Sequence, residues 1–349
     1  MIRIASFCRA LCLGLLLPAL TVPPAAASDF ATTIMTGVPG GTYIEIGRDI
    51  SRIAGECGLT VNVTESAGSL ENFLAVRQRP NTQFGIVQND VLEYFKTFQA
   101  DDPVIRRALF GVQIAFPLYN EEVHVLASRQ VRSLRDLADR RVSIGNADSG
   151  TFLTASLILD FMRLAPGETL TLDPAEALDA LLEGEIDAFF YVSGAPISLF
   201  DDPRIDPQRY HLLPITDDVL TSVYTPTSIA ARTYPWLTDS VPVVAVKAVL
   251  MTYEFNPRQN AYHRLACDAV SEVSHLIVNR FNRLQVEGHP KWRDIDLTDI
   301  PPGWRIASCV NRGLAPDYRS ECTTPRPPVP PEPEVNTLYR QRICAVLGC

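Results

Sequence analysis

Short apolar stretches alternate with amphipathic stretches along the sequence, and this alternation limits the chain to few fold classes. The first group has predicted strands at 30–35, 59–65 and 83–87 and predicted helices at 42–57 and 69–79. The second group has predicted strands at 141–145 and 185–192 and predicted helices at 133–140, 152–163 and 174–184. Strands that alternate with helices form parallel or mixed sheets. The sequence therefore predicts an α/β fold with two α/β domains.

Two longer apolar stretches, 122–127 and 241–250, flank the second group. We interpret them as strands by which the chain crosses into a second domain and returns. The predicted limits are 28–125 with 244–300 for α/β domain I, 126–243 for α/β domain II, and 301–349 for a C-terminal extension. That extension contains cysteines and a proline-rich spacer at 323–334, which is expected to be stiff and extended.

The N-terminus has the features of a secretory signal peptide. Arg3 and Arg9 precede an apolar segment over 10–20, and three alanines at 25–27 provide a small-residue cleavage site. We predict that residues 1–27 are removed and that the mature protein is periplasmic. The apolar segment is too short to span a bilayer, so the mature chain is not expected to cross a membrane.

The chain is acidic, with a formal net charge of −9 that becomes −11 once residues 1–27 and their two arginines are removed. This charge argues against nucleic acid or an anionic membrane as a partner. Closely spaced cysteine pairs typical of zinc modules are absent from the sequence, and no metal or cofactor is expected. The histidines are scattered singly and are interpreted as structural or exposed: His124, His211, His263, His275 and His289.

Six cysteines remain after removal of the predicted signal peptide: Cys57, Cys267, Cys309, Cys322, Cys344 and Cys349. An even number in an oxidising compartment predicts disulfides. Proximity favours the pairs Cys309–Cys322 and Cys344–Cys349, which leaves Cys57 with Cys267. The sequence alone cannot choose among the possible pairings.

Glycines and small polar residues gather where predicted strands end. In open α/β sheets, ligands bind outside the carboxyl ends of strands, and helix N-termini there suit an anion such as a carboxylate. The candidate ligand-binding residues are Gly41, Thr42, Tyr43, Ser69, Gln88, Asn89, Ser149, Gly150, Thr151, Ser193 and Gly194. The alternative for each turn is a helix cap alone, and Thr42 with Glu45 has the spacing of a capping box.

Two patterns could suggest an enzyme. The segment ADSGT, residues 147–151, is similar to the nucleophile turn of chymotrypsin-like serine proteases, but it lacks their full Gly-Asp-Ser-Gly-Gly pattern and lies in an α/β context. The acidic pairs Glu121–Glu122, Asp201–Asp202 and Asp217–Asp218 are predicted to be solvated loop charges. We therefore expect no catalytic residue.

Five segments in this order resemble one known family: TGVPGGTYIEIG, ESAGSLENFLAVR, QFGIVQND, DLADRRVSIGNADSGT and EALDALLEGEIDAFFYVSGAPI. They look like the TAXI-type extracytoplasmic solute-binding proteins that serve TRAP transporters. The resemblance covers about residues 30–255. It implies the type II periplasmic binding protein fold, in which two α/β domains joined by crossing strands close over a ligand.

The resemblance also implies a function and roles for the candidate residues. It implies a monomer that binds a small carboxylate, such as an amino acid, a dicarboxylate or a 2-oxo acid, and delivers it to membrane transporter subunits. By position, the first domain would contribute Gly41, Thr42, Tyr43, Ser69, Gln88 and Asn89. Ser149, Gly150 and Thr151 would hold a carboxylate from the second domain, with Ser193 and Gly194 nearby.

The chain departs from the family pattern at Val38–Pro39, at Glu65 and in the extension after Leu297. Glu65 would disfavour an anion if it pointed into the site. A second hypothesis follows from the extension: an exported sensor or interaction protein that keeps the fold and binds a partner through its disulfide-bearing tail.

Overall fold

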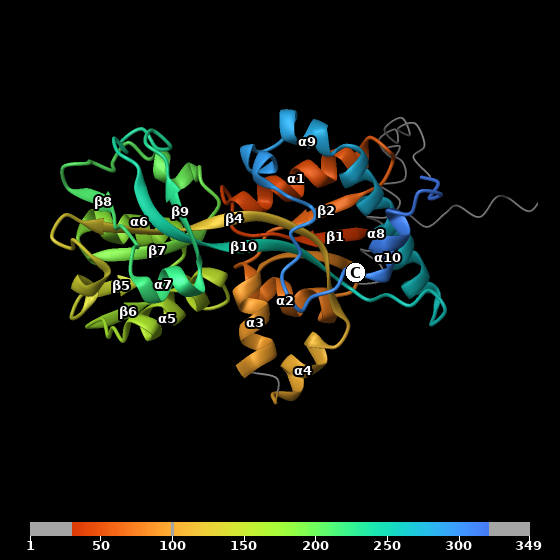
Figure 1. Cartoon of the computed structure of the whole chain (residues 1–349), viewed down its shortest axis with the longest axis horizontal. Helices are drawn as coiled ribbons and strands as arrows, with labels where there is room; N and C mark the ends of the chain where they lie inside the picture. Colours follow the sequence, from red (N-terminus) through yellow and green to blue (C-terminus); the bar gives the residue numbers. More distant parts are fainter. Residues whose placement is uncertain (1–29, 99–100, 321–349) are drawn as a thin grey trace, which may run out of the picture.

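The computed structural model describes residues 30–98 and 101–320. The predicted signal peptide, the proline-rich spacer, Cys322, Cys344 and Cys349 lie outside the described residues. Within the described part, the chain forms two α/β lobes joined by two long strands that run between them (Figure 1). No helix in this part has the length and apolar composition needed to cross a bilayer.

The strands are β1 (Thr32–Met35), β2 (Val61–Thr64), β3 (Thr82–Gln88), β4 (Val112–Ser128), β5 (Arg141–Ser143), β6 (Glu168–Leu170), β7 (Ala188–Ser193), β8 (Tyr210–Leu212), β9 (Thr225–Ile229) and β10 (Val241–Tyr253). The α-helices are α1 (Thr42–Gly55), α2 (Ser69–Gln78), α3 (Asn89–Phe98), α4 (Pro103–Leu109), α5 (Gly150–Met162), α6 (Pro174–Glu183), α7 (Asp218–Val223), α8 (Ala261–Asn279), α9 (Phe281–Glu287) and α10 (Ser308–Gly313). Short 3-10 helices are η1 (Leu134–Leu137), η2 (Ser198–Asp201) and η3 (Pro290–Asp294).

The strands join in one mixed sheet of order β2-β1-β3-β10-β4-β7-β5-β6. Strands β2, β1 and β3 are parallel in the first lobe, and β7, β5 and β6 are parallel in the second. Between them, β10 is antiparallel to both β3 and β4, and β4 is antiparallel to β7. The mixed α/β fold expected from the sequence is confirmed.

The crossing strands expected from the sequence are β4 and β10. They pair with each other along most of their length, from Ala245 with Glu122 to Tyr253 with Val112. Strand β4 begins ten residues before the predicted stretch, at Val112, so the segment from Val112 to Glu121 was not recognised as strand. This segment lacks a strict two-residue alternation because both of its faces are covered by other elements.

Each lobe has its own apolar core. In the first lobe, Ile46, Ile50 and Ile53 lie on one face of α1 and pack into a cluster with residues of β3, β10 and α8. In the second lobe, apolar residues of α5 and α6 pack against the sheet. They belong to two clusters whose buried members lie between Val123 and Val246 in the sequence. The domain limits proposed from the sequence stay a prediction.

Sequence reasoning missed several short elements. The predicted helix at 133–140 is only the 3-10 turn η1, because the backbone leaves the helical conformation at Ala138, with a ψ of 135°, and is left-handed at Asp139, with a φ of +59°. Helices α3 and α4, helix α7 and strands β8 and β9 were not predicted. Most of these elements are short and carry little sequence periodicity, whereas α3 has ten residues and an amphipathic pattern that sequence reasoning overlooked.

The chain between Pro301 and Ser320 packs onto the first lobe. Ala307, Cys309 and Val310 are buried in its core, and Ile306 forms a parallel bridge with Ile114 at the start of β4. A disulfide between Cys267 of α8 and Cys309 of α10 fixes this segment. The predicted pairs Cys57–Cys267 and Cys309–Cys322 are therefore wrong, because tertiary packing of α10 on α8 outweighs proximity in the sequence. Cys57 also forms a disulfide.

The Cys267–Cys309 disulfide closes a loop with a sequence separation of 42 residues. We expect the double variant C267A/C309A to lose about 2–4 kcal/mol of unfolding free energy, because the unfolded chain regains the freedom that the cross-link removes. Urea unfolding of variant and wild type, followed by circular dichroism, measures the difference. Coincident unfolding curves would show that this disulfide does not stabilise the first lobe.

Candidate ligand-binding site between the lobes

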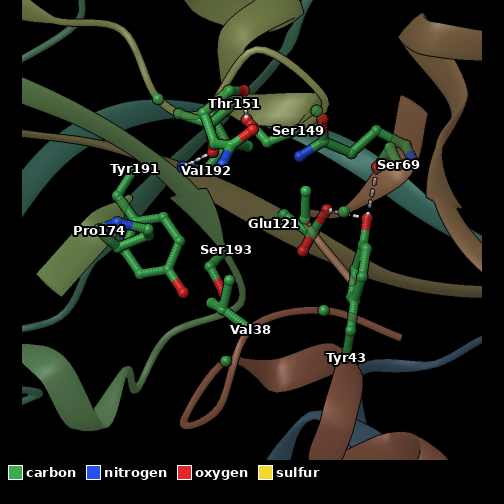
Figure 2. A pocket seen from close by; sticks show the side chains of 18 of the residues that line it. Val38, Tyr43, Ser69, Glu121, Ser149, Thr151, Pro174, Tyr191, Val192 and Ser193 are labelled. Carbon is green, nitrogen blue, oxygen red and sulfur yellow. Dashed lines mark hydrogen bonds between the residues drawn. The ribbon is translucent and has the colours of Figure 1, made fainter. Parts of the chain in front are cut away.

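A cavity of ≈ 50 Å³ lies between the two lobes, at the carboxyl ends of their parallel strands. The first lobe contributes the turns after β1 and β2 and the end of β3. The second lobe contributes the turn from β5 to α5, the start of α6 and the end of β7. Figure 2 shows these side chains gathered from both sides around one space. This is the position at which open α/β sheets bind ligands.

Nine of the predicted residues line this cavity: Gly41, Thr42, Tyr43, Ser69, Gln88, Ser149, Gly150, Thr151 and Ser193. Gly194 does not line it, but its carbonyl accepts a hydrogen bond from Thr42. Asn89 lies instead at a second hollow of ≈ 460 Å³, formed by α3, α5, β9 and β10. The ligand-binding role of all these residues stays a prediction. Glu65 is exposed and does not line the cavity.

Two glycines permit the close approach of the lobes. Gly68, which precedes α2, has a φ of +130°, and a Cβ there would lie 3.3 Å from the Ser149 Cα. A Cβ on Gly150 would lie 1.9 Å from the Gln88 Oε1 and 2.7 Å from the Ser69 Oγ. Gly68 and Gly150 belong to different lobes, so the absence of a side chain at each position allows the opposite lobe to approach closely.

Hydrogen bonds across the cavity mouth join the lobes in this closed arrangement. The Thr42 hydroxyl donates to the Gly194 carbonyl at 2.6 Å, and the Ser198 hydroxyl donates to the Gly40 carbonyl at 3.0 Å. On another side, the Thr154 hydroxyl of α5 donates to the Asp90 carboxylate of α3 at 2.7 Å. Each such bond contributes about 0.5–1.5 kcal/mol, so together they favour closure without making it irreversible.

The expected capping box of Thr42 and Glu45 is wrong. Gly41 is the N-cap of α1 and forms no side-chain cap, while Thr42 is already the first helical residue. Its hydroxyl is used across the lobes instead. Tertiary contact with Gly194 therefore replaces the local capping bond.

Ser149 caps helix α5 and also lines the cavity. Its hydroxyl accepts from the Phe152 N–H at 3.1 Å and donates to the Asn146 carbonyl at 2.7 Å, so it caps α5 while lining the cavity. The Thr151 hydroxyl accepts from the Val192 N–H at 3.1 Å. The first N–H groups of a helix have no partner within the helix, and Gly150 and Thr151 place those of α5 at the cavity wall.

The structure contradicts the prediction that Glu121 and Glu122 are solvated. Both lie within β4 and are buried, with exposures of 1% and 7%. Glu122 forms an ion pair of 2.6 Å with Lys291 of η3 and accepts from the Ala195 N–H. Glu121 lines the cavity and accepts a hydrogen bond of 2.8 Å from the Tyr43 hydroxyl. The Glu121 position could not be recognised because β4 was predicted to start too late.

Burial raises the pKa of the Glu121 carboxyl to about 8, and hydrogen bonds from Tyr43 and Gln88 offset only part of this shift. Burial likewise raises the pKa of the Tyr43 hydroxyl well above its ordinary value, with the nearby Glu121 charge as the next cause. At neutral pH, Tyr43 is therefore a donor and Glu121 is largely protonated.

Tyr191 was also missed and lines the cavity beside Ser193. Burial raises the pKa of its hydroxyl to about 12. Its side chain follows the period-two alternation of β7, but all residues of this strand are buried, so alternation alone could not distinguish a cavity face. No group of acidic, histidine or cysteine side chains able to hold a metal ion occurs in the described part of the chain.

Residues 34–265 match the NMT1-like family, which is more than half of the 349 residues. The chain belongs to the NMT1-like family. Among solved structures, this NMT1-like protein is similar to a periplasmic sulfonate-binding protein, SsuA, of Methylobacillus flagellatus, with 14% identity, coverage of 91% of this chain and 86% of that chain, and a TM-score of 0.39.

Two further similar structures are MatC of Rhodopseudomonas palustris with bound malate and the substrate-binding protein of an amino acid ABC transporter. MatC has 15% identity, coverage of 73% and 88%, and a TM-score of 0.44. The amino acid transporter protein has 8% identity, coverage of 74% and 99%, and a TM-score of 0.42. At these values the likenesses carry no information about the ligand of this NMT1-like protein.

The raised pKa of Glu121 predicts a pH-dependent stability. Between about pH 4.5 and 8 the folded protein keeps a proton on this carboxyl that the unfolded chain releases, so the group costs stability as pH rises through this window. We expect E121Q to gain stability relative to wild type, by on the order of a few kcal/mol, between pH 5 and pH 8.5. Urea unfolding of both proteins at the two pH values measures this gain. Parallel pH profiles would contradict the assignment.

Proposed function

We propose that this protein is a periplasmic solute-binding protein, which captures a small organic anion between its lobes and delivers it to a membrane transporter. One observation carries the proposal: both lobes supply the walls of a single cavity, and hydrogen bonds across its mouth hold them closed. A ligand in this cavity is enclosed by lobe closure. No bond of the ligand is broken in the proposed cycle.

The size of the cavity supports a small ligand. Pockets for drug-sized molecules measure about 300–1,000 Å³, whereas this cavity measures ≈ 50 Å³ in the closed arrangement. A ligand must therefore be small, and the lobes must separate to admit it. The paired strands β4 and β10 are the connection about which such separation would occur.

The chemistry of the second-lobe wall supports a carboxylate. Helix α5 begins at Gly150, and its free N–H groups and positive dipole end face the space between the lobes. Hydroxyl groups at Ser69 and Ser193 add further polar atoms to the lining. These groups suit a carboxylate oxygen in a way that an apolar wall would not.

The finer assignment rests on the sequence. The ordered motifs that resemble TAXI-type proteins and the predicted signal peptide support a periplasmic protein that serves a TRAP-type transporter.

The substitution G150A tests lobe closure directly. Its new Cβ would collide with Gln88 and Ser69 of the opposite lobe, whereas each lobe alone could fold as before. We expect G150A to have a larger radius of gyration than wild type in small-angle X-ray scattering. It should also lose the thermal stabilisation that a bound acid gives, which amounts to about 2.7 kcal/mol at one hundred times the dissociation constant.

The matched control is G55A, at the last residue of α1, where a Cβ meets nothing within 4 Å. Thermal shifts of wild type, G150A and G55A are compared against a panel of amino acids, dicarboxylates and 2-oxo acids. G55A should behave as wild type. Retained binding and an unchanged radius of gyration in G150A would show that closure does not depend on Gly150, whereas the absence of a thermal shift in wild type and G55A with every acid would contradict the proposed capture.

A further inference from the structure

The cavity contains one acidic side chain and no basic one among its described lining residues. Glu121 is the acid, and its residue is 1% exposed. The buried basic side chain of Lys291 in η3 pairs with Glu122 at 2.6 Å and with Asp294 at 3.4 Å. Within the described chain, no ion pair to Glu121 occurs. The cavity therefore holds an acid without a cation to balance it.

Burying a lone carboxylate is costly, because water no longer solvates its charge, so without a cation beside it Glu121 keeps its proton at neutral pH. The hydrogen bond from Tyr43 offsets part of this cost but supplies no positive charge. If Glu121 served only to hold Tyr43 in place, a neutral glutamine could accept the same bond. An acid at this position is explained if a cation enters the cavity from outside.

We propose that Glu121 receives a protonated amine of the ligand, so that the site selects small molecules carrying an ammonium group beside a carboxylate. This rests on the proposed function, since the carboxylate is assigned to the N-terminus of α5. Glu121 thereby becomes the residue that distinguishes an amino acid from the corresponding 2-oxo acid.

The arrangement of the cavity suits such a ligand. Figure 2 shows the Glu121 carboxyl between Tyr43 of the first lobe and the turn of Ser149 and Thr151 in the second. An ammonium group could contact Glu121 while the carboxylate of the same molecule lies at the start of α5. Tyr43 and Tyr191 also line the cavity, and aromatic side chains can stabilise a cation placed over the face of the ring.

Binding of an amine would be linked to pH. Burial keeps Glu121 protonated below about pH 8, and an ammonium group requires the ionised form. A proton must therefore leave Glu121 for the solvent when the amine binds. The titratable groups around Glu121 do not balance its charge: Tyr43 of α1, Asp90 of α3, Tyr119 and Glu122 of β4, and Tyr191 of β7.

A ligand without an amine would show the opposite behaviour. A 2-oxo acid brings only negative charge, so it would bind best while Glu121 is neutral and would weaken as pH rises through 8. An amino acid should instead gain affinity by roughly tenfold per pH unit between pH 6 and pH 8, because more of Glu121 is ionised. The pH dependence of affinity for an amino acid and its matched 2-oxo acid therefore shows whether Glu121 receives an amine.

The experiment is isothermal titration calorimetry of the mature chain with matched pairs at pH 6, 7 and 8. The probes are glutamate with 2-oxoglutarate, alanine with pyruvate, and aspartate with oxaloacetate. We expect the amino acid of at least one pair to bind more tightly and to release one proton at pH 6, measured by the dependence of the heat on buffer ionisation enthalpy.

The variant E121Q should weaken amino acid binding at pH 8 by roughly 10- to 100-fold, because a hydrogen bond between two charged groups is lost. It should also abolish proton release. The control E65Q removes an exposed acid that does not line the cavity and should bind as wild type. Unchanged affinity and proton release in E121Q would overturn the assignment.

The outcomes also separate this inference from the proposed function. If a 2-oxo acid or dicarboxylate binds and its amino acid partner does not, Glu121 does not receive an amine, while capture of an organic anion stands. If no member of any pair binds the wild type or E65Q, the proposed capture of organic anions fails and the role of Glu121 fails with it.

Discussion

The antiparallel pairing of β4 with β10 is the constraint on which the rest of the structure depends. These two strands carry the chain from one lobe to the other and back, and their ladder joins the parallel strands of both lobes into one sheet. The carboxyl ends of β1, β2 and β3 therefore face those of β5 and β7 across a gap. Because loops and helix N-termini lie at these ends, the polar turns of each lobe face those of the other lobe.

The same strand pair brings buried charge to the junction. Glu121 and Glu122 are consecutive in β4, so their side chains point to opposite faces of the sheet. Glu122 meets Lys291 and the Ala195 N–H, which ties η3 of the first lobe to the turn after β7. Glu121 meets Tyr43 on the cavity side. Glu122 is therefore paired with a lysine of the protein, whereas Glu121 faces the cavity without a basic partner in the described chain.

Closure depends on residues that are small rather than reactive. Gly68 and Gly150 leave room for the opposite lobe, and hydroxyl groups of Thr42 and Ser198 reach backbone carbonyls across the gap. The Ser149 and Thr151 hydroxyls form hydrogen bonds with backbone groups around α5. The N–H groups at the start of that helix therefore remain as the part of the wall that attracts an anion. The site is thus built mainly from backbone geometry.

The sequence by itself determined the α/β class, the crossing strands and most of the turns that line the cavity, because these follow from local periodicity and from glycines before helices. It could not place Glu121, since a strand buried on both faces shows no alternation that marks a cavity side. Nor could it pair Cys267 with Cys309, or show that the Thr42 hydroxyl donates a hydrogen bond to the Gly194 carbonyl instead of capping its own helix. These features depend on contacts between distant segments, and only the tertiary structure brings those segments within reach.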